Sequence, residues 1–141
     1  NASWSSSEGT HTLFIDQSII HLPVVKPHIV VGQIHDDDVI VFRLEKNKLF
    51  IKIDDETGPV LDNNYQLGTR FNVMFKVKNN QTECYYNGKL KFTYPKAFTG
   101  AYFKAGAYVQ SSCQGRIKVE GEACEAYGAV EIYNVWVKHE P

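Results

Sequence analysis

Two stretches of this 141-residue chain place chemically capable side chains on one face of an expected β-strand. In residues 102–110 the odd positions are mostly apolar, whereas the even positions carry hydroxyl, ammonium and amide groups around Gly106. Such alternation is typical of a strand with one face in the core and one face outside. As a single strand, the stretch would present a row of possible binding groups about 26 Å long, formed by Tyr102, Lys104, Tyr108 and Gln110.

The second stretch is 28–35, which is apolar until Gln33 and His35. Two residues apart on a strand, these side chains are expected to share a face about 6.6 Å from each other. Histidine accepts a proton near neutral pH, and a phenol such as Tyr108, with an ordinary pKa near 10, suits proton donation. A lone histidine at a strand end is more often a surface residue, so the prediction of a site depends on both stretches together.

The rest of the chain predicts an all-β fold that positions these strands. Strand patterns recur between Gly, Pro, Asn and Asp residues, and no helical periodicity is evident. The sequence Asn87-Gly88 predicts a two-residue hairpin, because it supplies the positive φ angles that such a turn needs. Residues 54–68 are expected to form a long loop at the rim of a cleft. Strands are expected at 12–22, 28–35, 39–44, 49–53, 71–78, 83–86, 89–94, 102–110 and 128–138. Composition leaves a jelly roll, an immunoglobulin-like sandwich and a closed barrel open.

The bulk composition argues against several classes of partner. With a net charge of −1, 43% hydrophobic and 22% charged residues, the chain is an ordinary globular domain without a general attraction to nucleic acid. No apolar run approaches the roughly 20 residues needed to cross a bilayer. The acidic run 36–38 lacks the spaced ligands and the glycine of a calcium loop, so neither a metal site nor a cofactor is predicted.

Cysteines and glycosylation signals favour a secreted, extracellular protein. Cys113 and Cys124 flank a polar segment and are predicted to form a disulfide. Cys84 is then either a small buried hydrophobic residue or the partner of a cysteine outside this chain. Asn1 and Asn80 each begin an Asn-X-Ser/Thr acceptor sequence for N-glycosylation.

Taken together, the two stretches resemble polysaccharide lyase family 7, the alginate lyases. The resemblance is carried by Gln-Ile-His at 33–35 and Tyr-Phe-Lys-Ala-Gly-Ala-Tyr-Val-Gln at 102–110, and it extends over essentially the whole chain. It implies a β-jelly roll of two antiparallel sheets with a long substrate cleft across its concave sheet. It also implies catalytic roles for Gln33, His35 and Tyr108. Substrate binding is expected of Tyr102, Lys104 and Gln110.

The resemblance implies an endo-type alginate lyase, which cleaves 4-linked uronate chains by β-elimination and releases unsaturated oligosaccharides. Removing the C5 proton beside a carboxylate requires that the negative charge be damped, and a hydrogen bond from the Gln33 amide could do this. Tyr108 could serve as both base and acid if a nearby positive charge lowered its pKa. The preference between mannuronate and guluronate stays open, although Ile34 is loosely associated with guluronate in this family.

Two other functions compete with the lyase. A non-catalytic carbohydrate-binding module could hold an anionic polysaccharide with the tyrosines and Lys104, but it has little use for an imidazole beside an amide. A glycoside hydrolase usually needs two opposed carboxylates, and neither motif strand carries one on its polar face.

One expected motif is absent from the sequence. Family members carry Arg-(Thr/Ser)-Glu-Leu-Arg upstream of this region, whereas Arg43, Arg70 and Arg116 lie in other contexts. Residues 1–141 are therefore expected to be a single domain, the C-terminal portion of a catalytic jelly roll that lacks its first strands. An N-terminal segment or a second chain is expected to supply the arginine and to complete the sheets, since unpaired sheet edges favour aggregation.

Overall fold

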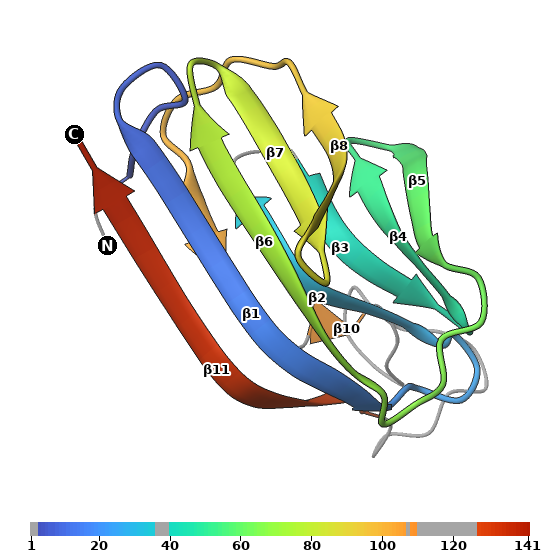
Figure 1. The fold of residues 1–141 in the computed structure, drawn as a ribbon. Helices are drawn as coiled ribbons and strands as arrows, with labels where there is room; N and C mark the ends of the chain where they lie inside the picture. The colour runs from blue at the N-terminus through green and yellow to red at the C-terminus, as the bar shows by residue number, and fades with distance from the viewer. Residues whose placement is uncertain (1–2, 36–39, 107, 110–126) are drawn as a thin grey trace.

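The structure, a computed structural model, describes residues 3–35, 40–106, 108–109 and 127–141. Two antiparallel β-sheets pack face to face in this part of the chain (Figure 1). The expected all-β fold of two antiparallel sheets is thus confirmed. Across the described ranges there is no helix long and apolar enough to span a membrane.

The first sheet has five strands in the order β11-β1-β6-β7-β8. Its strands are β1 (Thr10–His21), β6 (Arg70–Lys78), β7 (Gln81–Tyr86), β8 (Lys89–Tyr94) and β11 (Ala129–Glu140). The second sheet has the order β10-β2-β3-β4-β5, and the short strand β9 also pairs with β2. Its strands are β2 (His28–His35), β3 (Ile40–Glu45), β4 (Lys48–Ile53), β5 (Glu56–Asp62), β9 (Tyr102–Lys104) and β10 (Tyr108–Val109).

Alternating apolar residues of both sheets form the core between them. On β6 the predicted inward row is buried, from Phe71 to Val77, and the residues between its members are only half-buried. Phe75 stacks on Phe42 of the opposite sheet, with ring centroids 4.5 Å apart. The predicted hairpin turn between β7 and β8 is also confirmed, because Asn87 and Gly88 have φ angles of 49° and 81°.

A β-bulge in β2 decides which way its polar residues face. Val30 pairs with Arg43 and Gln33 pairs with Val41, so three residue steps on β2 oppose two steps on β3. One extra residue on a strand reverses the alternation between its two faces.

The bulge depends on Gly32. Its φ is +150°, and a Cβ at this position would lie 3.0 Å from Cδ1 of Ile15 in the core. Ile29, Val31 and Ile34 are all buried in the core although their numbers do not share one parity. The change of phase leaves Gln33 and His35 on the outer face; with regular alternation they would share the core face of Ile29 and Val31.

Two expected segments differ from the structure. Residues 54–68 were expected to be a loop, but 56–62 form β5, an edge strand whose pairing with β4 is interrupted by irregularities. Gly58 and Pro59 suggested a loop, yet an edge strand tolerates proline because one side of it needs no hydrogen-bond donor.

The expectation of one continuous strand over 102–110 was also wrong. The stretch is divided into β9 and β10, with Gly106 between them at a φ of +108°. Ala105, expected to point inward, is exposed. Both short strands still pair with β2, so the polar residues remain beside the same neighbour.

Of the cysteines, Cys84 is described. It is fully buried and free, as expected of a small hydrophobic residue, and burial strongly raises the pKa of its thiol. The predicted Cys113–Cys124 disulfide lies outside the described residues.

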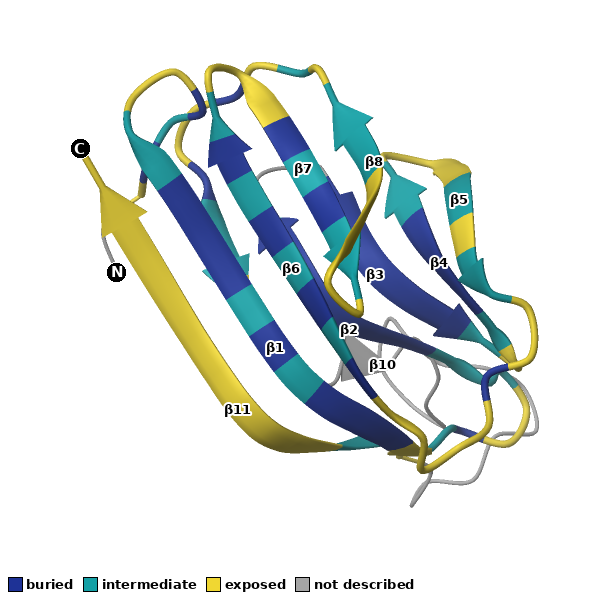
Figure 2. Cartoon of the chain, in the orientation of Figure 1, coloured by how far each residue is buried: buried dark blue, intermediate teal, exposed yellow. Residues whose placement is uncertain are grey.

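The two sides of the sandwich differ in how well they are closed. On one side β5 and β8 are in contact, and Asp54 bridges the sheets by accepting a hydrogen bond from Tyr94 at 3.3 Å and pairing with Lys96 at 3.6 Å. On the other side β11 is exposed along nearly its whole length (Figure 2).

An aromatic cluster joins the beginning and the end of the described chain. Trp4 forms an isolated bridge with Ala101 and stacks on His11, with centroids 4.4 Å apart. The Nδ1 atoms of His11 and His139 lie 2.7 Å apart, and the ring of Phe103 is 6.2 Å from that of His139. These contacts tie β1, β9 and β11 together at one end of the sandwich.

Candidate active site

Four of the six predicted site residues meet on the outer face of the second sheet. Gln33 pairs with Lys104, and His35 pairs with Tyr102, across the β2–β9 ladder. Directly paired residues on neighbouring antiparallel strands place their side chains on the same face. We refer to Gln33, His35, Tyr102 and Lys104 as the β2–β9 quartet.

Within the quartet, Gln33 and His35 are in contact. The amide Nε2 of Gln33, a residue that is only 9% exposed, lies 3.3 Å from Nδ1 of His35. With the amide nitrogen facing Nδ1, its N–H donates to the ring, and the proton of the neutral imidazole then resides on Nε2. The predicted shared face of these two residues is confirmed, and Gln33 orients the imidazole.

Tyr102 and Lys104, on β9, lie beside His35 and toward solvent. The ring of Tyr102 is 4.8 Å from that of His35, at an interplanar angle of 55°. Nζ of Lys104 lies 5.6 Å from the centroid of the Tyr102 ring, within the range of a cation–π contact. Lys104 is exposed, so its ammonium group can receive an anionic ligand from solution.

Tyr108 lies on β10, the second short strand that pairs with β2. It pairs with Val30, which is three residues from Gln33, whereas Tyr108 is four residues from Lys104 along the chain. The extra residue around Gly106 faces the bulged stretch of β2. Gln110 lies outside the described residues, so its predicted binding role stays a prediction, as do the catalytic roles of Gln33, His35 and Tyr108.

Sequence reasoning missed a second polar cluster on the same face. Arg43, which pairs with Val30, is 8% exposed, and its Nη2 lies 2.9 Å both from Oε1 of Glu45 and from Nδ1 of His28. The alternation of Arg43 and Glu45 with the apolar Phe42 and Leu44 could have revealed it. Because Arg43 forms an ion pair with Glu45, its charge is already neutralised by a carboxylate of the protein.

Burial and charge hold His28 neutral in this cluster. Desolvation lowers its pKa below 6.5, and the neighbouring Arg43 lowers it further, although the Glu45 carboxylate acts in the opposite direction. A neutral His28 can accept the N–H of Arg43 at Nδ1. The cluster is thus an ion pair with an imidazole cap, in which Nη2 of Arg43 is paired while its buried Nε has no hydrogen-bond partner in the described part of the chain. Elsewhere in the described ranges, no group of three or more His, Cys, Asp and Glu side chains has the arrangement of a metal site.

Comparisons with known proteins match this geometry to one family. Residues 1–139 match the family model described as alginate lyase. The alginate lyase AlgAT5 from polysaccharide lyase family 7 is 52% identical, with a TM-score of 0.93, over 100% of this chain and 64% of its own. The alginate lyase from Corynebacterium sp. is 42% identical, with a TM-score of 0.91, over 99% of this chain and 63% of its own. A search of curated proteins found no match.

A more distant structure shares the fold. The family 7 alginate lyase A1-II', in a variant solved with substrate (GGMG), is 21% identical, with a TM-score of 0.71, over 98% of this chain and 63% of its own. This chain therefore spans slightly less than two thirds of the length of these three lyases.

The two sheets of this chain are those of the β-jelly roll of these enzymes. With a family model matched over 1–139 and two lyases at 42% and 52% identity, the chain belongs to polysaccharide lyase family 7, the alginate lyases.

Proposed function

We propose that this chain forms part of an endo-type alginate lyase, which cleaves 4-linked uronate chains by β-elimination. The observation that carries the proposal is the β2–β9 quartet, in which an amide, an imidazole, a phenol and an ammonium group share one face. The relatives named above are alginate lyases, and one was solved with an alginate oligosaccharide, which supports a polyuronate as the substrate.

Gln33 is proposed to damp the charge of the substrate carboxylate. A glutamine amide carries two N–H groups, and one of them is directed at His35. The other can donate to the carboxylate beside C5 and stabilise the enolate-like state as negative charge develops. Lys104 binds the carboxylate of a neighbouring sugar.

Tyr108 is proposed to transfer the proton at both stages. Since Nδ1 of His35 receives an N–H from Gln33, the neutral imidazole is a donor at Nε2 and is poorly suited to act as the base. Tyr108 as phenolate takes the C5 proton, the C4=C5 double bond forms, and the C4–O bond breaks. The phenol then returns the proton to the leaving oxygen. A positive charge nearby would favour the phenolate.

The quartet itself contains one cationic residue, Lys104. Both arginines within the described ranges are paired with carboxylates: Arg43 with Glu45, and Arg70 with Asp16 in the other sheet. We therefore propose that the arginine of the family motif reaches the site from an N-terminal segment or a second chain.

The test is cleavage of mannuronate-rich and guluronate-rich alginate, followed by the ultraviolet absorbance of the unsaturated product. The chain is assayed in the presence of that completing segment. Tyr108→Phe is expected to lower the rate at least about 100-fold, as for loss of a proton-transfer group. His35→Ala is expected to lower it by a similar factor, because it removes the hydrogen-bond donor at Nε2 and the partner of the Gln33 amide. Lys104→Ala should raise KM more than it lowers kcat, and Lys91→Ala on β8 is the matched control. Full activity of either of the first two variants on both block types would refute its assigned role.

A carbohydrate-binding module is the second candidate. It is favoured for the chain alone because Arg43 and Arg70 are both paired with carboxylates, so neither is available to neutralise the carboxylate of a substrate during cleavage. It predicts binding to alginate without any rise in absorbance, even when the completing segment is present. Product length in the same assay separates endo cleavage, which gives oligosaccharides from the start, from release of single terminal sugars.

We further propose that the protein is secreted. The acceptor residue Asn80 is exposed in the turn between β6 and β7, where an attached glycan would not disturb the core. Expression in a eukaryotic secretory host, followed by glycan removal, should lower the mass of a glycosylated chain; Thr82→Ala is the control for Asn80.

A further inference from the structure

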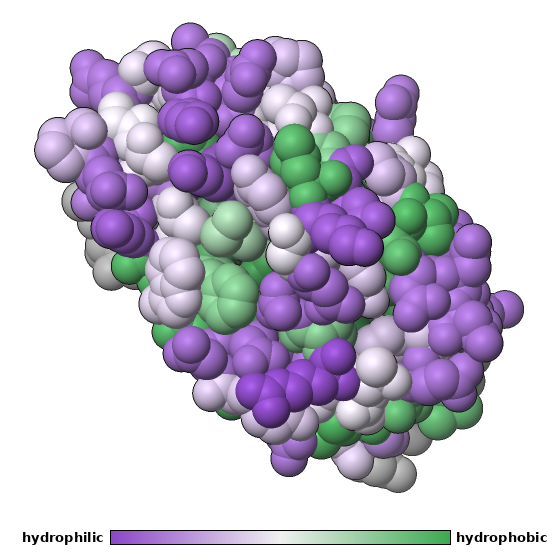
Figure 3. Space-filling view, viewed as in Figure 1, coloured by the Kyte–Doolittle hydropathy of each residue, from purple (hydrophilic) through white to green (hydrophobic). Residues whose placement is uncertain are grey.

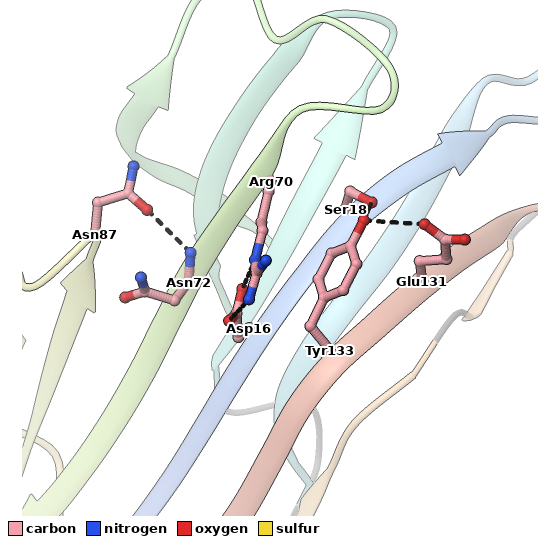
Figure 4. Close-up of polar contacts among 7 residues, drawn as sticks. All are labelled: Asp16, Ser18, Arg70, Asn72, Asn87, Glu131 and Tyr133. Atoms are coloured by element: carbon pink, nitrogen blue, oxygen red, sulfur yellow. Dashed lines mark hydrogen bonds and ion pairs between the residues drawn. The ribbon is translucent and has the colours of Figure 1, made fainter.

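The two faces of β11 differ in how well they are suited to contact with water. On the outer face, Tyr133 donates a hydrogen bond to Glu131 at 2.9 Å and shares another with Ser18 at 2.9 Å, and the Arg70 guanidinium lies 4.2 Å from its ring (Figure 4). Asp16 holds Arg70 with two hydrogen bonds. This side of the sheet presents a largely hydrophilic surface (Figure 3). The outer face therefore meets water with its polar groups paired.

The inner face of β11 lacks an equivalent cover. Val135 and Val137 pair directly with Ile15 and Leu13, which are 0% and 2% exposed. Paired residues lie on the same face of a sheet, yet Val135 and Val137 are 44% and 49% exposed. Ile132, opposite the fully buried Gln17, is 41% exposed. The core thus continues onto β11 as an apolar row that is open to solvent.

The edge of β11 is open as well. Over its 12 residues β11 pairs with β1, and in the described chain no strand lies on its other side. An unpaired edge of this length offers a row of N–H and C=O groups to another strand. The opposite sheet ends at β9 and β10, and the contact of Phe103 with His139 is where it reaches toward β11.

We infer that the edge and inner row of β11 are a docking surface for the part of the lyase catalytic domain that residues 1–141 do not match. The occupant is a segment with apolar residues on one face, which pairs with the β11 edge and covers Ile132, Val135 and Val137. About a third of the length of each matched lyase lies outside the match. Trp4 lies beside His139, so a segment that precedes it would enter at the end of β11.

A second copy of this chain fits the surface less well. Two β11 edges could pair with each other, but such pairing would extend the first sheet alone. The inner row of both copies would stay exposed, because neither copy adds a strand to the opposite sheet beside β9. A segment that supplies strands to both sheets removes both defects.

This inference deepens the proposed function, because the same segment would bring the arginine to the quartet. Its test measures association and backbone protection, so the two proposals can fail separately. A complex that forms but does not cleave alginate would leave the docking surface in place and refute the lyase assignment.

The experiment mixes the 141-residue chain with a separate polypeptide, the portion of AlgAT5 that precedes its matched region. Light scattering should show a one-to-one complex. Hydrogen–deuterium exchange should show slower exchange of β11 amides in the complex than in the chain alone. Val135→Lys should weaken the complex at least about tenfold, because a lysine there must be buried against apolar groups.

The matched control is Leu90→Lys on β8, the other edge of the same sheet, where Leu90 is 51% exposed. It should change the affinity less than about twofold, as expected for a surface substitution outside the interface. Absence of a complex, protection that appears away from β11, or equal effects of the two substitutions would overturn the inference. A dimer of the unmixed chain with protected β11 amides would identify a second copy as the occupant and overturn it too. If Val135→Lys does not fold, hydrogen–deuterium exchange of the β11 amides in the unsubstituted chain, with and without the partner polypeptide, decides whether the inference holds.

Discussion

The two sides of the sandwich differ in whether the opposite sheet covers the edge strand. One side is closed by the contact of β5 with β8, and the other is open at β11. Both β8 and β11 are edge strands of one sheet, and both carry exposed apolar residues. Behind β8, however, Phe92 and Tyr94 pack against the core, and β5 covers the gap between the sheets. Behind β11, the residues that continue the core row remain open to solvent.

The difference shows that pairing within a sheet does not by itself bury a strand. β11 pairs with β1 along most of its length, just as β7 pairs with β8. The apolar residues on the inner face of β11 nevertheless remain exposed to solvent. Burial of apolar area requires an element in the opposite layer, and this burial is the main favourable term in folding. We therefore expect stability to be concentrated on the closed side.

The largest expected effect contrasts a residue of β3, in the middle of the core, with a residue of the open side. Phe42→Ala removes a fully buried ring that stacks on Phe75, and it should cost about 3–5 kcal/mol of unfolding free energy. Val135→Ala on β11 should cost less than about 1 kcal/mol, because that side chain is already half in water. Denaturant unfolding of the two variants measures both values. Similar costs would mean that β11 contributes to the core as fully as β3 does.

The second prediction tests the strand that supplies the site. Gly32→Ala forces an unfavourable backbone angle on alanine and pushes a methyl group toward Ile15, so it should cost about 3 kcal/mol. Gly68→Ala is the control, since Gly68 has a φ of +91° but open space around it. That variant should lose about 1 kcal/mol from backbone strain alone. Equal losses in thermal or denaturant unfolding would remove packing at the bulge as the cause.

The third prediction concerns pH at the open end. Nε2 of His11 lies 2.6 Å from the carbonyl oxygen of Glu8 and donates to it, so Nδ1 of a neutral His11 accepts the N–H of His139. Protonating both rings would place two N–H groups against each other. Desolvation, and then the neighbouring His11, lower the pKa of His139.

Because its folded-state pKa is lowered, His139 takes up a proton more readily in the unfolded chain. Its contribution is complete above the unfolded pKa near 6.5 and declines as the pH falls toward the lower folded value. The melting temperature should therefore fall on acidification below about pH 6.5. His139→Asn should flatten this decline, whereas His21→Asn, at the other end of β1, should not. An unchanged slope in His139→Asn would show that the histidine pair has no such role.

The smallest expected effect is at the bridge across the closed side. Asp54→Ala removes the hydrogen bond from Tyr94 and the ion pair with Lys96, both of which are partly exposed to solvent. The loss should be between about 0.2 and 1 kcal/mol, with partial screening of the ion pair by salt. A loss above about 2 kcal/mol at moderate salt would show that this bridge, and not apolar burial, closes the sandwich.

Much of the fold could be predicted because local chemistry and tertiary structure agree. The alternation from Phe71 to Val77 and the Asn87-Gly88 turn are local signals, and both are confirmed. Gln33 and His35 were placed on one face from their spacing, and their contact confirms it.

Features that depend on distant residues were not predictable from local patterns. The outward direction of Gln33 depends on the register between β2 and β3, which a strand pattern does not contain. The pattern of β11 indicated a strand correctly, but its exposure is decided by the opposite layer. Glycine at 106 was interpreted as a gap in one strand, although it separates two.

The bulge in β2 also decides which changes of length this strand can accept during evolution. Loss of the one extra residue between Val30 and Gln33 would give a regular strand in which two steps oppose two on β3, and the amide and the imidazole would stay on the outer face. Insertion or loss of one residue between Gln33 and His35 would instead place these two side chains on opposite faces of the sheet. Homologues that keep the activity should therefore be able to lack the bulge residue but should conserve the two-residue spacing from Gln33 to His35.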